Sequence, residues 1–237
     1  SARYDENDAL MFFDDVKVPW DRIFVHRDPD MCRRQFHDTP GHIYQNYQAQ
    51  IRLTVKLKFL VGLAREVCET IGTVKLPPVA DALGKMAAQA AAVENMMWGM
   101  EAKGSQWGKY FVPDRHAVYA AQTLTQEYYP MIINTLRELA GGALIMLPSS
   151  TEDLDHPELA AIAESVQVSA DGRSAEDRIK MMKLVWDAVG SEFAGRHTQY
   201  EMFYAGAQFV TRGHSFRTYD WEKSAALIRT ITDRYGR

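Results

Sequence analysis

The sequence predicts a mainly α-helical protein in which long helices pack against each other as an antiparallel bundle. Over several long segments, apolar residues recur every three or four positions, which is the spacing of one helix face. Glycine and proline separate these segments, and one short stretch near the start shows strand-like alternation. Because the segments have similar lengths and broad apolar faces, a bundle is the simplest way to bury those faces.

Residues 9–20, which read ALMFFDDVKVPW, predict extended structure. Val16, Val18 and Trp20 alternate along this segment, and Pro19 excludes a helix there. A single strand cannot bury both of its faces. We therefore expect it to be the end of a β-region whose partner strands lie outside this chain, and the chain to be part of a longer protein.

The first long helix is predicted over residues 48–71, and Gly72 and the Pro77-Pro78 pair end it. Its apolar side chains recur at every fourth position, at Ile51, Val55, Phe59, Leu63, Val67 and Ile71. A second helix, over residues 79–102, contains an alanine-rich run. Small side chains let a neighbouring helix approach closely, so we expect these two helices to pack together.

A third helix is predicted from the capping residue Asp114 to Leu139, with a kink at Pro130. Its inward side is expected to carry Val118, Leu124, Tyr128, Ile132, Leu136 and Leu139. A short helix over residues 157–165 follows. The next long helix is predicted to begin at Ser174 and to end at Gly206.

The inward row of that helix is expected to be Ile179, Met182, Trp186, Val189 and Phe193. A final helix, over residues 220–235, has an apolar side formed by Ala225, Ile228 and Ile231. The apolar stripes are wider than one bundle contact needs. We therefore expect the bundle to pack against other subunits as well.

Composition excludes several classes of protein. The chain has 237 residues, 46% of them hydrophobic and 24% charged, and a formal net charge of -4, which is unlike a nucleic-acid-binding protein. No apolar run is long enough to span a bilayer, and the first residues do not resemble a signal peptide, so we expect a cytoplasmic protein. Paired Glu-x-x-His motifs and His-Glu-x-x-His are absent from the sequence, so we expect no metal site.

Two glycines after the third helix, Gly141 and Gly142, allow two interpretations. Glycine at a helix C-terminus is most often a plain cap. A second glycine makes a bare backbone that faces a ligand more plausible, because its N–H groups can reach a diphosphate or an amide.

Three polar side chains near helix or strand ends are further candidates. Arg196 offers a fork for a phosphate or a ring carbonyl, or else an ion pair with Glu192 or Glu201. Taken alone, His197 is better explained as an interior, hydrogen-bonded histidine than as a ligand contact. His26 follows the strand end, where it can take a proton from a phenol or remain a surface histidine.

Three stretches together resemble the two-component flavin monooxygenases of the 4-hydroxyphenylacetate 3-monooxygenase family. They are DALMFFDDVKVPWDRIFVHRD, RELAGGALIMLPSS and WDAVGSEFAGRHTQYEMFYAGA. FVHRD together with DTPGHIYQNYQAQIR is most similar to the chlorophenol and nitrophenol branch. The resemblance covers essentially the whole chain and corresponds to the C-terminal half of such an enzyme.

This resemblance implies an acyl-CoA-dehydrogenase-like fold with a helical N-terminal domain, a middle β-domain and a C-terminal helical bundle. Residues 1–25 would be the end of the β-domain, and residues 26–237 the bundle and oligomerisation domain of a homotetramer. It also implies reduced FAD (FADH2) that diffuses from an NADH-dependent flavin reductase. Reaction with O2 gives a flavin C4a-hydroperoxide that hydroxylates a phenol, with loss of halide or nitrite in the halophenol and nitrophenol branch.

By the same resemblance, His26 is the substrate base or phenolate partner. The expected FAD-binding residues are Tyr204, Ala205, Gly206 and Ala207 in a late turn, then Arg196 and His197, then Gly141 and Gly142. In relatives with the acyl-CoA dehydrogenase fold, the late turn ends in threonine where this chain has Ala207, and the Gly-Gly turn touches the FAD of a neighbouring subunit.

Three alternatives remain at this point. Within the family, 4-hydroxyphenylacetate 3-hydroxylation uses the same chemistry on another phenol. A non-catalytic helical scaffold would only assemble subunits. An acyl-CoA dehydrogenase ranks last, because the late turn holds no convincing catalytic glutamate.

Overall fold

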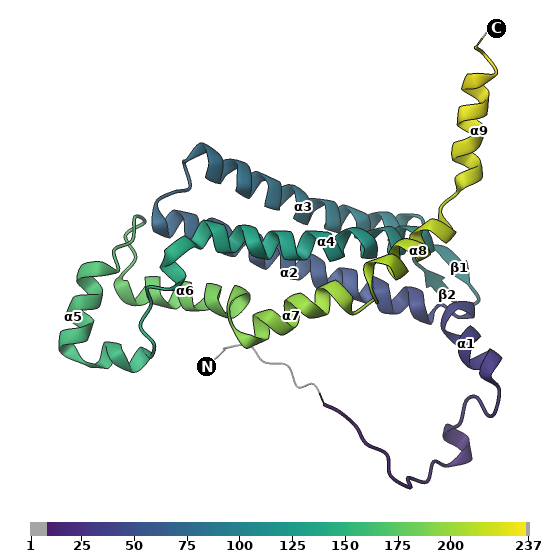
Figure 1. Cartoon of the computed structure of the whole chain (residues 1–237), viewed down its shortest axis with the longest axis horizontal. Helices are drawn as coiled ribbons and strands as arrows, with labels where there is room; N and C mark the ends of the chain where they lie inside the picture. The colour runs from purple at the N-terminus through teal and green to yellow at the C-terminus, as the bar shows by residue number, and fades with distance from the viewer. Residues whose placement is uncertain (1–8, 236–237) are drawn as a thin grey trace.

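A computed structural model describes residues 9–235, and three long helices form its centre. They are α2 (Gly41–Ile71), α3 (Pro77–Ala102) and α4 (Arg115–Ala140), which pack along one another (Figure 1). Gly72 ends α2 in the left-handed conformation, with φ of 85° and its N–H bonded to the carbonyl of Cys68. Asp114 caps α4 by accepting a hydrogen bond from Ala117 N–H at 2.7 Å, as the sequence predicts.

The helix predicted over residues 48–71 begins earlier, at Gly41. Its first two turns lack an apolar row because, apart from Ile43, their buried side chains are the polar His42 and Asn46. Asn46 accepts a hydrogen bond from the Gln122 amide at 2.6 Å, and Nδ1 of His42 lies 2.8 Å from the Tyr119 hydroxyl. Polar partners on α4 therefore replace the apolar contacts that sequence periodicity detects.

A short β-hairpin, which the sequence analysis did not predict, joins α3 to α4. Its strands are β1 (Ser105–Trp107) and β2 (Tyr110–Val112), and they pair antiparallel with Gln106 opposite Phe111. Gly108 turns the chain between them with φ of 57°.

Shorter helices follow along the second half of the chain: η2 (Gly141–Leu144), η3 (Thr151–Asp155), α5 (Pro157–Val166), α6 (Ala175–Val189), α7 (Glu192–Phe203), α8 (Gln208–Thr218) and α9 (Trp221–Thr232). Helices α6 and α7 pack against the long helices, and α8 crosses α4 (Figure 1). Among residues 9–235, no helix combines the length and the apolarity that crossing a bilayer needs.

The single helix predicted from Ser174 to Gly206 is wrong, because the chain breaks it at Gly190. The Trp186 ring occupies the space beside Gly190, and Ser191 then caps α7 by accepting a hydrogen bond from Ala194 N–H at 3.1 Å. Trp186, expected to point inward, is exposed. Its ring lies over the break instead of in the core.

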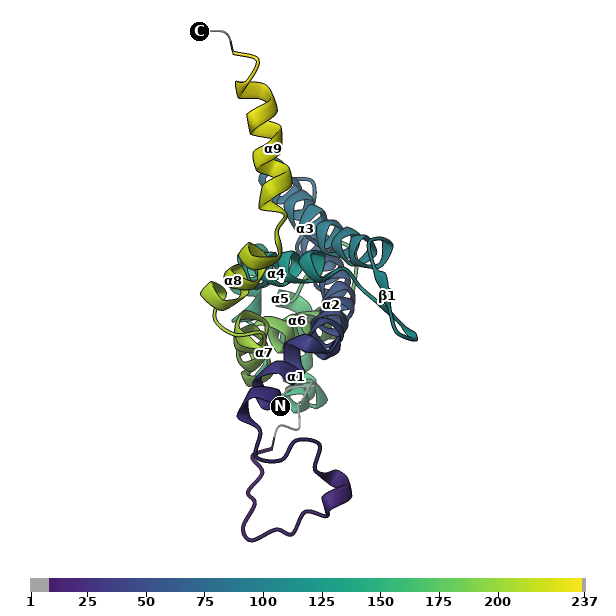
Figure 2. The same ribbon diagram turned by 90° about the vertical axis from the view of Figure 1, so that its right-hand side faces the viewer.

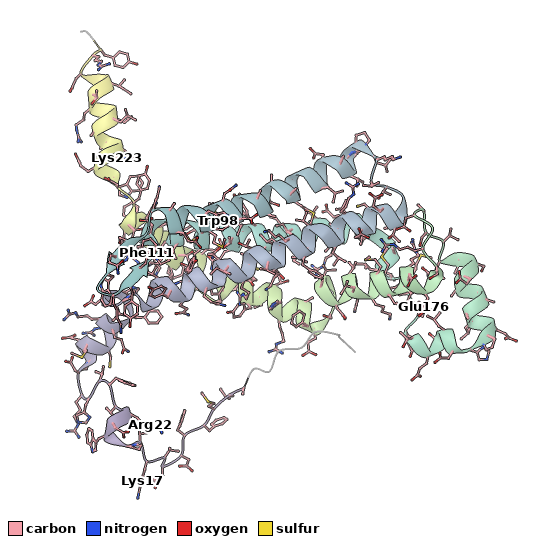
Figure 3. The ribbon with its side chains drawn as sticks, turned by 180° about the vertical axis from the view of Figure 1, so that it is seen from behind. Lys17, Arg22, Trp98, Phe111, Glu176 and Lys223 are labelled. Atoms are coloured by element: carbon pink, nitrogen blue, oxygen red, sulfur yellow. The ribbon has the colours of Figure 1, made fainter. Side chains whose placement is uncertain are left out.

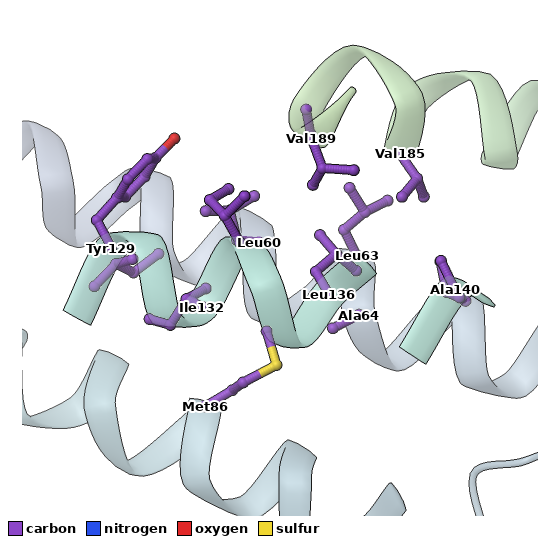
Figure 4. Packing of buried hydrophobic residues seen from close by; sticks show 14 of the residues in the cluster. Leu60, Leu63, Ala64, Met86, Tyr129, Ile132, Leu136, Ala140, Val185 and Val189 are labelled. Carbon is purple, nitrogen blue, oxygen red and sulfur yellow. The ribbon is translucent and has the colours of Figure 1, made fainter. Parts of the chain in front are cut away.

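The main core lies where α2, α3, α4 and α6 meet (Figure 4). Its buried side chains include Leu60 and Ala64 on α2, Met86 on α3, Ile132 on α4 and Val185 on α6. The inward residues predicted for α4 are confirmed at Val118, Ile132 and Leu136, whereas Leu124 is exposed.

The inward row predicted for α2 is correct only in its second half. Leu63 and Val67 are buried, but Ile51, Val55 and Phe59 are exposed. The first half of α2 buries the adjacent row at Leu53, Leu57 and Leu60. Both rows are apolar, so periodicity alone does not tell which one faces the bundle.

The strand predicted over residues 9–20 pairs with no other segment of the described chain. The segment runs away from the bundle, carries the short helix η1 (Trp20–Arg22) and leads into α1 (Pro29–Asp38) (Figure 2). Its large side chains, such as Phe12 and Trp20, are exposed. Residues 1–8, the start of the predicted β-domain remnant, lie outside the described residues.

Helix α9 projects from the body of the molecule (Figures 1 and 2). Figure 3, which labels Lys223 on α9 and Glu176 on α6, shows these two helices at opposite ends of the bundle. The apolar side predicted for the last helix exists, but Ile228 and Ile231 are 58% and 45% exposed. Beyond the half-buried Ala225, this face is therefore largely uncovered within the described chain.

Candidate functional site

A buried carboxylate on α7 gathers two cations from α2. Glu201 is only 2% exposed, and its Oε1 accepts hydrogen bonds from Lys56 Nζ at 2.5 Å and from Arg52 Nη2 at 3.1 Å. Residues four apart lie on one face of a helix, so Arg52 and Lys56 both point toward α7. Such a pair of charge-assisted hydrogen bonds fixes the position of both cations.

His197 lies one turn before Glu201 and joins this group. Its Nε2 is 2.7 Å from Lys56 Nζ. Burial, and then the charge of Lys56, lower the pKa of His197 to about 4. The imidazole is therefore neutral near pH 7, and since the ammonium of Lys56 donates to Nε2, the ring proton lies on Nδ1.

Tyr200 of α7 and Tyr204, which caps the C-terminal end of α7, cover the Arg52 guanidinium. The Arg52 Cζ lies 4.7 Å from the centre of the Tyr200 ring, and the rings of Tyr200 and Tyr204 stack with centroids 5.4 Å apart. The Tyr204 hydroxyl accepts a hydrogen bond from the Gln50 amide at 3.1 Å. Burial raises the pKa of Tyr204, so its phenol stays protonated at neutral pH.

An apolar cavity of about 610 Å³ opens beside this cluster, between α2, α4 and the break between α6 and α7. Its lining residues are Arg52, Val55, Lys56, Phe59, Leu60, Tyr129, Ala188, Phe193 and His197. The exposed side chains of α2 that the sequence placed in the core, Val55 and Phe59, thus form one wall. Small-molecule sites in proteins commonly have this size and an apolar lining with a few polar groups.

The turn predicted to bind FAD, Tyr204–Ala207, joins α7 to α8. Gly206 has φ of 99°, a conformation that favours glycine. The buried Gln126 of α4 donates hydrogen bonds to the carbonyls of Met202 and Gly206, both at 2.8 Å, and its Oε1 accepts one from Thr211 at 2.8 Å. One glutamine therefore holds this turn against α4.

The double glycine lies at the other end of α4. Gly141 has φ of 52°, and a Cβ atom at either Gly141 or Gly142 would meet nothing within 4 Å. Positive φ explains the first glycine, but close packing against the described residues 9–235 explains neither. Fifteen positions of helix separate Gln126 from Gly141, which at about 1.5 Å per residue is about 22 Å. Within one chain, the two predicted flavin contacts are therefore far apart.

The other three predicted residues, Arg196, His197 and His26, lie in three different places. His197 lines the cavity, whereas Arg196, the preceding residue of α7, is exposed and is not among the lining residues. His26 is exposed on the segment before α1, where its ring meets the edge of the Trp20 ring at a centroid distance of 4.9 Å. Thus His26 does not join the cavity within the described chain.

Sequence reasoning missed Arg52, Lys56 and the role of Glu201. The available signal was a pair of basic residues four positions apart, one helical turn, between apolar neighbours on the same helix. Among the residues that the structure describes, no group of three or more His, Cys, Asp or Glu side chains is arranged to hold a metal ion.

Comparison with known sequences decides the family. The sequence model described as HpaB, 4-hydroxyphenylacetate 3-hydroxylase C terminal, matches residues 32–233. The chain belongs to this family. The resemblance found in the sequence is thereby confirmed for most of the chain.

Members of the 4-hydroxyphenylacetate 3-hydroxylase family from several bacteria are similar to this chain. The oxygenase component of 4-hydroxyphenylacetate 3-monooxygenase from Klebsiella oxytoca is 35% identical over 99% of the chain and 45% of its own length. The protein of the same name from Pseudomonas aeruginosa is 34% identical over 92% of the chain and 42% of its own length. The oxygenase component of 4-nitrophenol 2-monooxygenase from a Rhodococcus species is 32% identical over 92% of the chain and 42% of its own length.

Solved structures confirm the fold. The oxygenase component of a 4-hydroxyphenylacetate 3-monooxygenase superposes with a TM-score of 0.87 at 26% identity, over 93% of this chain and 47% of that one. Its complex with FAD and 4-hydroxyphenylacetate gives a TM-score of 0.84. A 4-hydroxybutyryl-CoA dehydratase from N. maritimus, 17% identical, shares the fold with a TM-score of 0.81. The chain therefore has the predicted helical bundle, and it spans less than half the length of these relatives.

Proposed function

We propose that this chain is the C-terminal part of the oxygenase component of a two-component flavin monooxygenase that hydroxylates a phenol. The observation that carries the proposal is the superposition of this bundle on an oxygenase component that was solved with FAD and 4-hydroxyphenylacetate. Membership of the family and the names of the relatives support it. The second component is a flavin reductase that uses NADH and supplies reduced FAD by diffusion.

The chain offers residues that fit a flavin. The turn Tyr204–Ala207, with Arg196 and His197 on the helix before it, is one contact. The open space beside Gly141 and Gly142 is another, because backbone N–H groups without side chains admit a close ligand. The distance of about 22 Å along α4 from Gln126, which holds the turn, to Gly141 supports contacts to different flavins. We therefore propose a homo-oligomer, a tetramer by family resemblance, in which each flavin meets two chains.

When bound, reduced FAD supplies the electrons that activate O2 for hydroxylation. The residues of this chain exclude water and hold protons in place. Phe59, Tyr129 and Phe193 make an apolar wall that keeps solvent out. His197 stays neutral beside Lys56, so it accepts a hydrogen bond without carrying charge.

The proposed role of His26 as the phenol's base depends on the rest of the enzyme. Its side chain is exposed and lies on a segment that leaves the bundle. A base must reach the proton that it removes. This role therefore requires that another part of the assembled enzyme covers residues 20–28 next to the substrate.

The substrate is proposed to be a halogenated or nitrated phenol, with 4-hydroxyphenylacetate as the alternative. The sequence around FVHRD favours the first, whereas two of the relatives named above are 4-hydroxyphenylacetate enzymes. Steady-state turnover of 4-nitrophenol, a chlorophenol and 4-hydroxyphenylacetate by the assembled oxygenase with a flavin reductase ranks these substrates. Release of nitrite or chloride marks the first class.

Binding of reduced FAD tests the function itself. Anaerobic titration of the assembled protein with dithionite-reduced FAD is expected to show saturable binding. Affinity no better than that of an unrelated helical bundle would instead support a non-catalytic scaffold that only assembles subunits.

A further inference from the structure

Helix α1 lies against the bundle without burying any of its own residues. It sits at the end of the bundle that also carries α8 (Figure 1), and only Thr39 and Pro40 join it to α2. Its ring contacts with the bundle come from its last turns. The Phe36 ring lies 4.9 Å from the ring of His42, and the His37 ring lies 4.8 Å from it, measured between centroids. The attachment of α1 therefore depends on histidine rings.

Three histidines from three helices meet at this attachment. His37 of α1, His42 of α2 and His214 of α8 have ring centroids between 4.8 and 5.6 Å apart. Tyr119 of α4 supports them, since its hydroxyl lies 2.8 Å from Nδ1 of His42 and its ring stacks on His214 with centroids 4.9 Å apart. We call the three histidines the histidine cluster.

The side chains that carry a permanent charge beside the histidine cluster are positive. Arg115 of α4 donates a hydrogen bond to the carbonyl of His37 at 3.4 Å, and Nη2 of Arg217 on α8 lies 2.9 Å from Nδ1 of His214. Neither arginine forms an ion pair with a carboxylate within residues 9–235. A charged imidazole in the cluster thus has cations as its neighbours.

Carboxylates close in the sequence do not offset this charge. Asp38 accepts a hydrogen bond from Nε of Arg34 at 2.7 Å, and Asp114 accepts one from the N–H of Ala117 at the start of α4. The charges that act on the two buried or half-buried members of the cluster come from arginine and histidine. A proton added to the cluster therefore meets repulsion without a compensating anion in the described chain.

The folded structure already resists protonation of two cluster members. Burial, and then the charge of His37, lower the pKa of His42 to about 4, and burial, followed by the charge of Arg217, lowers the pKa of His214. Release of α1 uncovers His42 and takes the His37 charge away from both partners. Both pKa values then move back toward the ordinary 6.5, so a falling pH favours the released state.

We propose that the histidine cluster is an acid-sensitive contact, which holds α1 on the bundle while its rings are neutral and releases α1 about Thr39 and Pro40 when its rings become charged. The driving force is repulsion between imidazolium groups that lie beside two arginines. The inference concerns α1 and does not depend on the proposed function. Residues 20–28, including His26, precede α1 directly and move with it.

A distance measurement between two nitroxide labels reports whether α1 is docked. Cys32 on α1 is exposed and takes one label, whereas Cys68 is buried, and Ala88→Cys on the exposed side of α3 takes the other. Pulsed electron resonance of the intact chain is expected to show a narrow distance distribution at pH 7.5 and a broad one at pH 5. The ratio of released to docked α1 should rise at least about tenfold between pH 7 and pH 5.

Far-UV circular dichroism over the same pH range should stay constant, because the bundle remains folded while α1 leaves it. A ratio that changes less than about twofold would overturn the proposal. So would broadening that appears only together with loss of the helical signal, because it would show global unfolding.

His37→Phe keeps a ring at this position but cannot take a charge. We expect it to reduce the release of α1 at pH 5 by at least about threefold relative to the parent chain. His156→Phe is the matched control, because it removes an exposed histidine at the start of α5, at the other end of the bundle (Figure 1). It should release α1 as the parent does, and equal effects of the two substitutions would contradict the proposal.

His42→Asn tests the buried member of the cluster. Its amide does not titrate in this range and can still bond the Tyr119 hydroxyl. A folded variant is expected to release less α1 at pH 5 than the parent, and release equal to the parent's would remove His42 from the cluster and overturn the assignment. If this variant does not fold, His37→Phe decides, because His37 is exposed and its replacement spares the core.

Salt separates charge repulsion from other effects of acid. The screening length falls to about 3 Å in 1 M NaCl, which is shorter than the separation of the rings. Release of α1 at pH 5 should therefore decrease at least about twofold in 1 M NaCl. Release that is unchanged by salt would show that repulsion does not move α1, and the proposal would fail whether or not the assembled protein binds reduced FAD.

Discussion

The carboxylate of Glu201 is buried between two cations from another helix, so its removal leaves both of them without their shared partner. We expect Glu201→Ala to lower the free energy of unfolding by about 3–5 kcal/mol, since it breaks a buried ion cluster. Glu94→Ala removes a carboxylate from the more exposed pair with Lys58, and its cost should stay within about 1 kcal/mol. Urea unfolding of both variants measures this. An equal loss of unfolding free energy in the two variants would show that the buried Glu201 cluster contributes no more than the exposed pair.

The lowered pKa of His42 predicts that the free energy of unfolding depends on pH. Burial, and then the positive charges of His37, His214 and Arg115, lower its pKa to about 4. The unfolded chain binds a proton at this histidine below about pH 6.5 while the folded chain does not, so the free energy of unfolding falls as pH decreases from about 6.5 to about 4. In His42→Asn, urea unfolding across this range should show a smaller slope. An unchanged slope would assign the effect to other groups, such as His197.

Several site residues escaped prediction because their meaning depends on distant partners. Gln126 is an ordinary polar residue in the sequence, yet its amide holds the turn at Gly206 from another helix. Arg52 and Lys56 become a pair only once α7 brings Glu201 to them. His197 was named as a candidate because it sits in a stretch that resembles the family; the structure places it in the wall of the cavity, and its contact with flavin stays a prediction.

At the scale of elements, the break between α6 and α7 offers a sharp test. A Cβ atom at Gly190 would lie 2.7 Å from the Trp186 ring, so Gly190→Ala should destabilise the fold by about 1–3 kcal/mol although alanine favours helices. Gly195 on α7 has open space around it, and Gly195→Ala should stabilise by up to about 1 kcal/mol. Thermal unfolding compares the two. Stabilisation by both substitutions would show that the Trp186 contact does not matter.

Most of the long helices could be predicted from the spacing of their apolar residues and from the glycine, proline and capping residues at their ends. Pro77 and Gly72 set the boundary between α2 and α3, and Asp114 set the start of α4. Helices α1 and α8 and the hairpin were missed, because short elements leave too few positions for a period to stand out. The break at Gly190 was missed because the apolar row continues through it.

At the scale of the whole molecule, the exposed apolar face of α9 predicts that the chain forms oligomers in solution. Its apolar residues Leu227, Ile228 and Ile231 are exposed, and the helix stands away from the bundle. We propose that this face packs against another subunit. The double variant Ile228→Asp and Ile231→Asp should lower the oligomeric state measured by sedimentation, while circular dichroism of the bundle stays the same. An unchanged oligomer would place the subunit contact elsewhere.

The assignment of residues 1–25 to a β-domain and of residues 26–237 to the bundle stays a prediction. The segment before α1 carries exposed aromatic and apolar side chains such as Phe12, Phe13 and Trp20. A strand needs a neighbour to satisfy its backbone groups, and a sequence can indicate extended structure without indicating where that neighbour comes from.

The cavity lies across the point where α6 gives way to α7. Ala188 contributes to its wall before the break and Phe193 after it. The angle between the two helices at Gly190 therefore controls the width of the opening. A bend of a few degrees there would widen or narrow the cavity without replacing any side chain that lines it, so the backbone at one glycine, together with the wall residues, sets the size of the space.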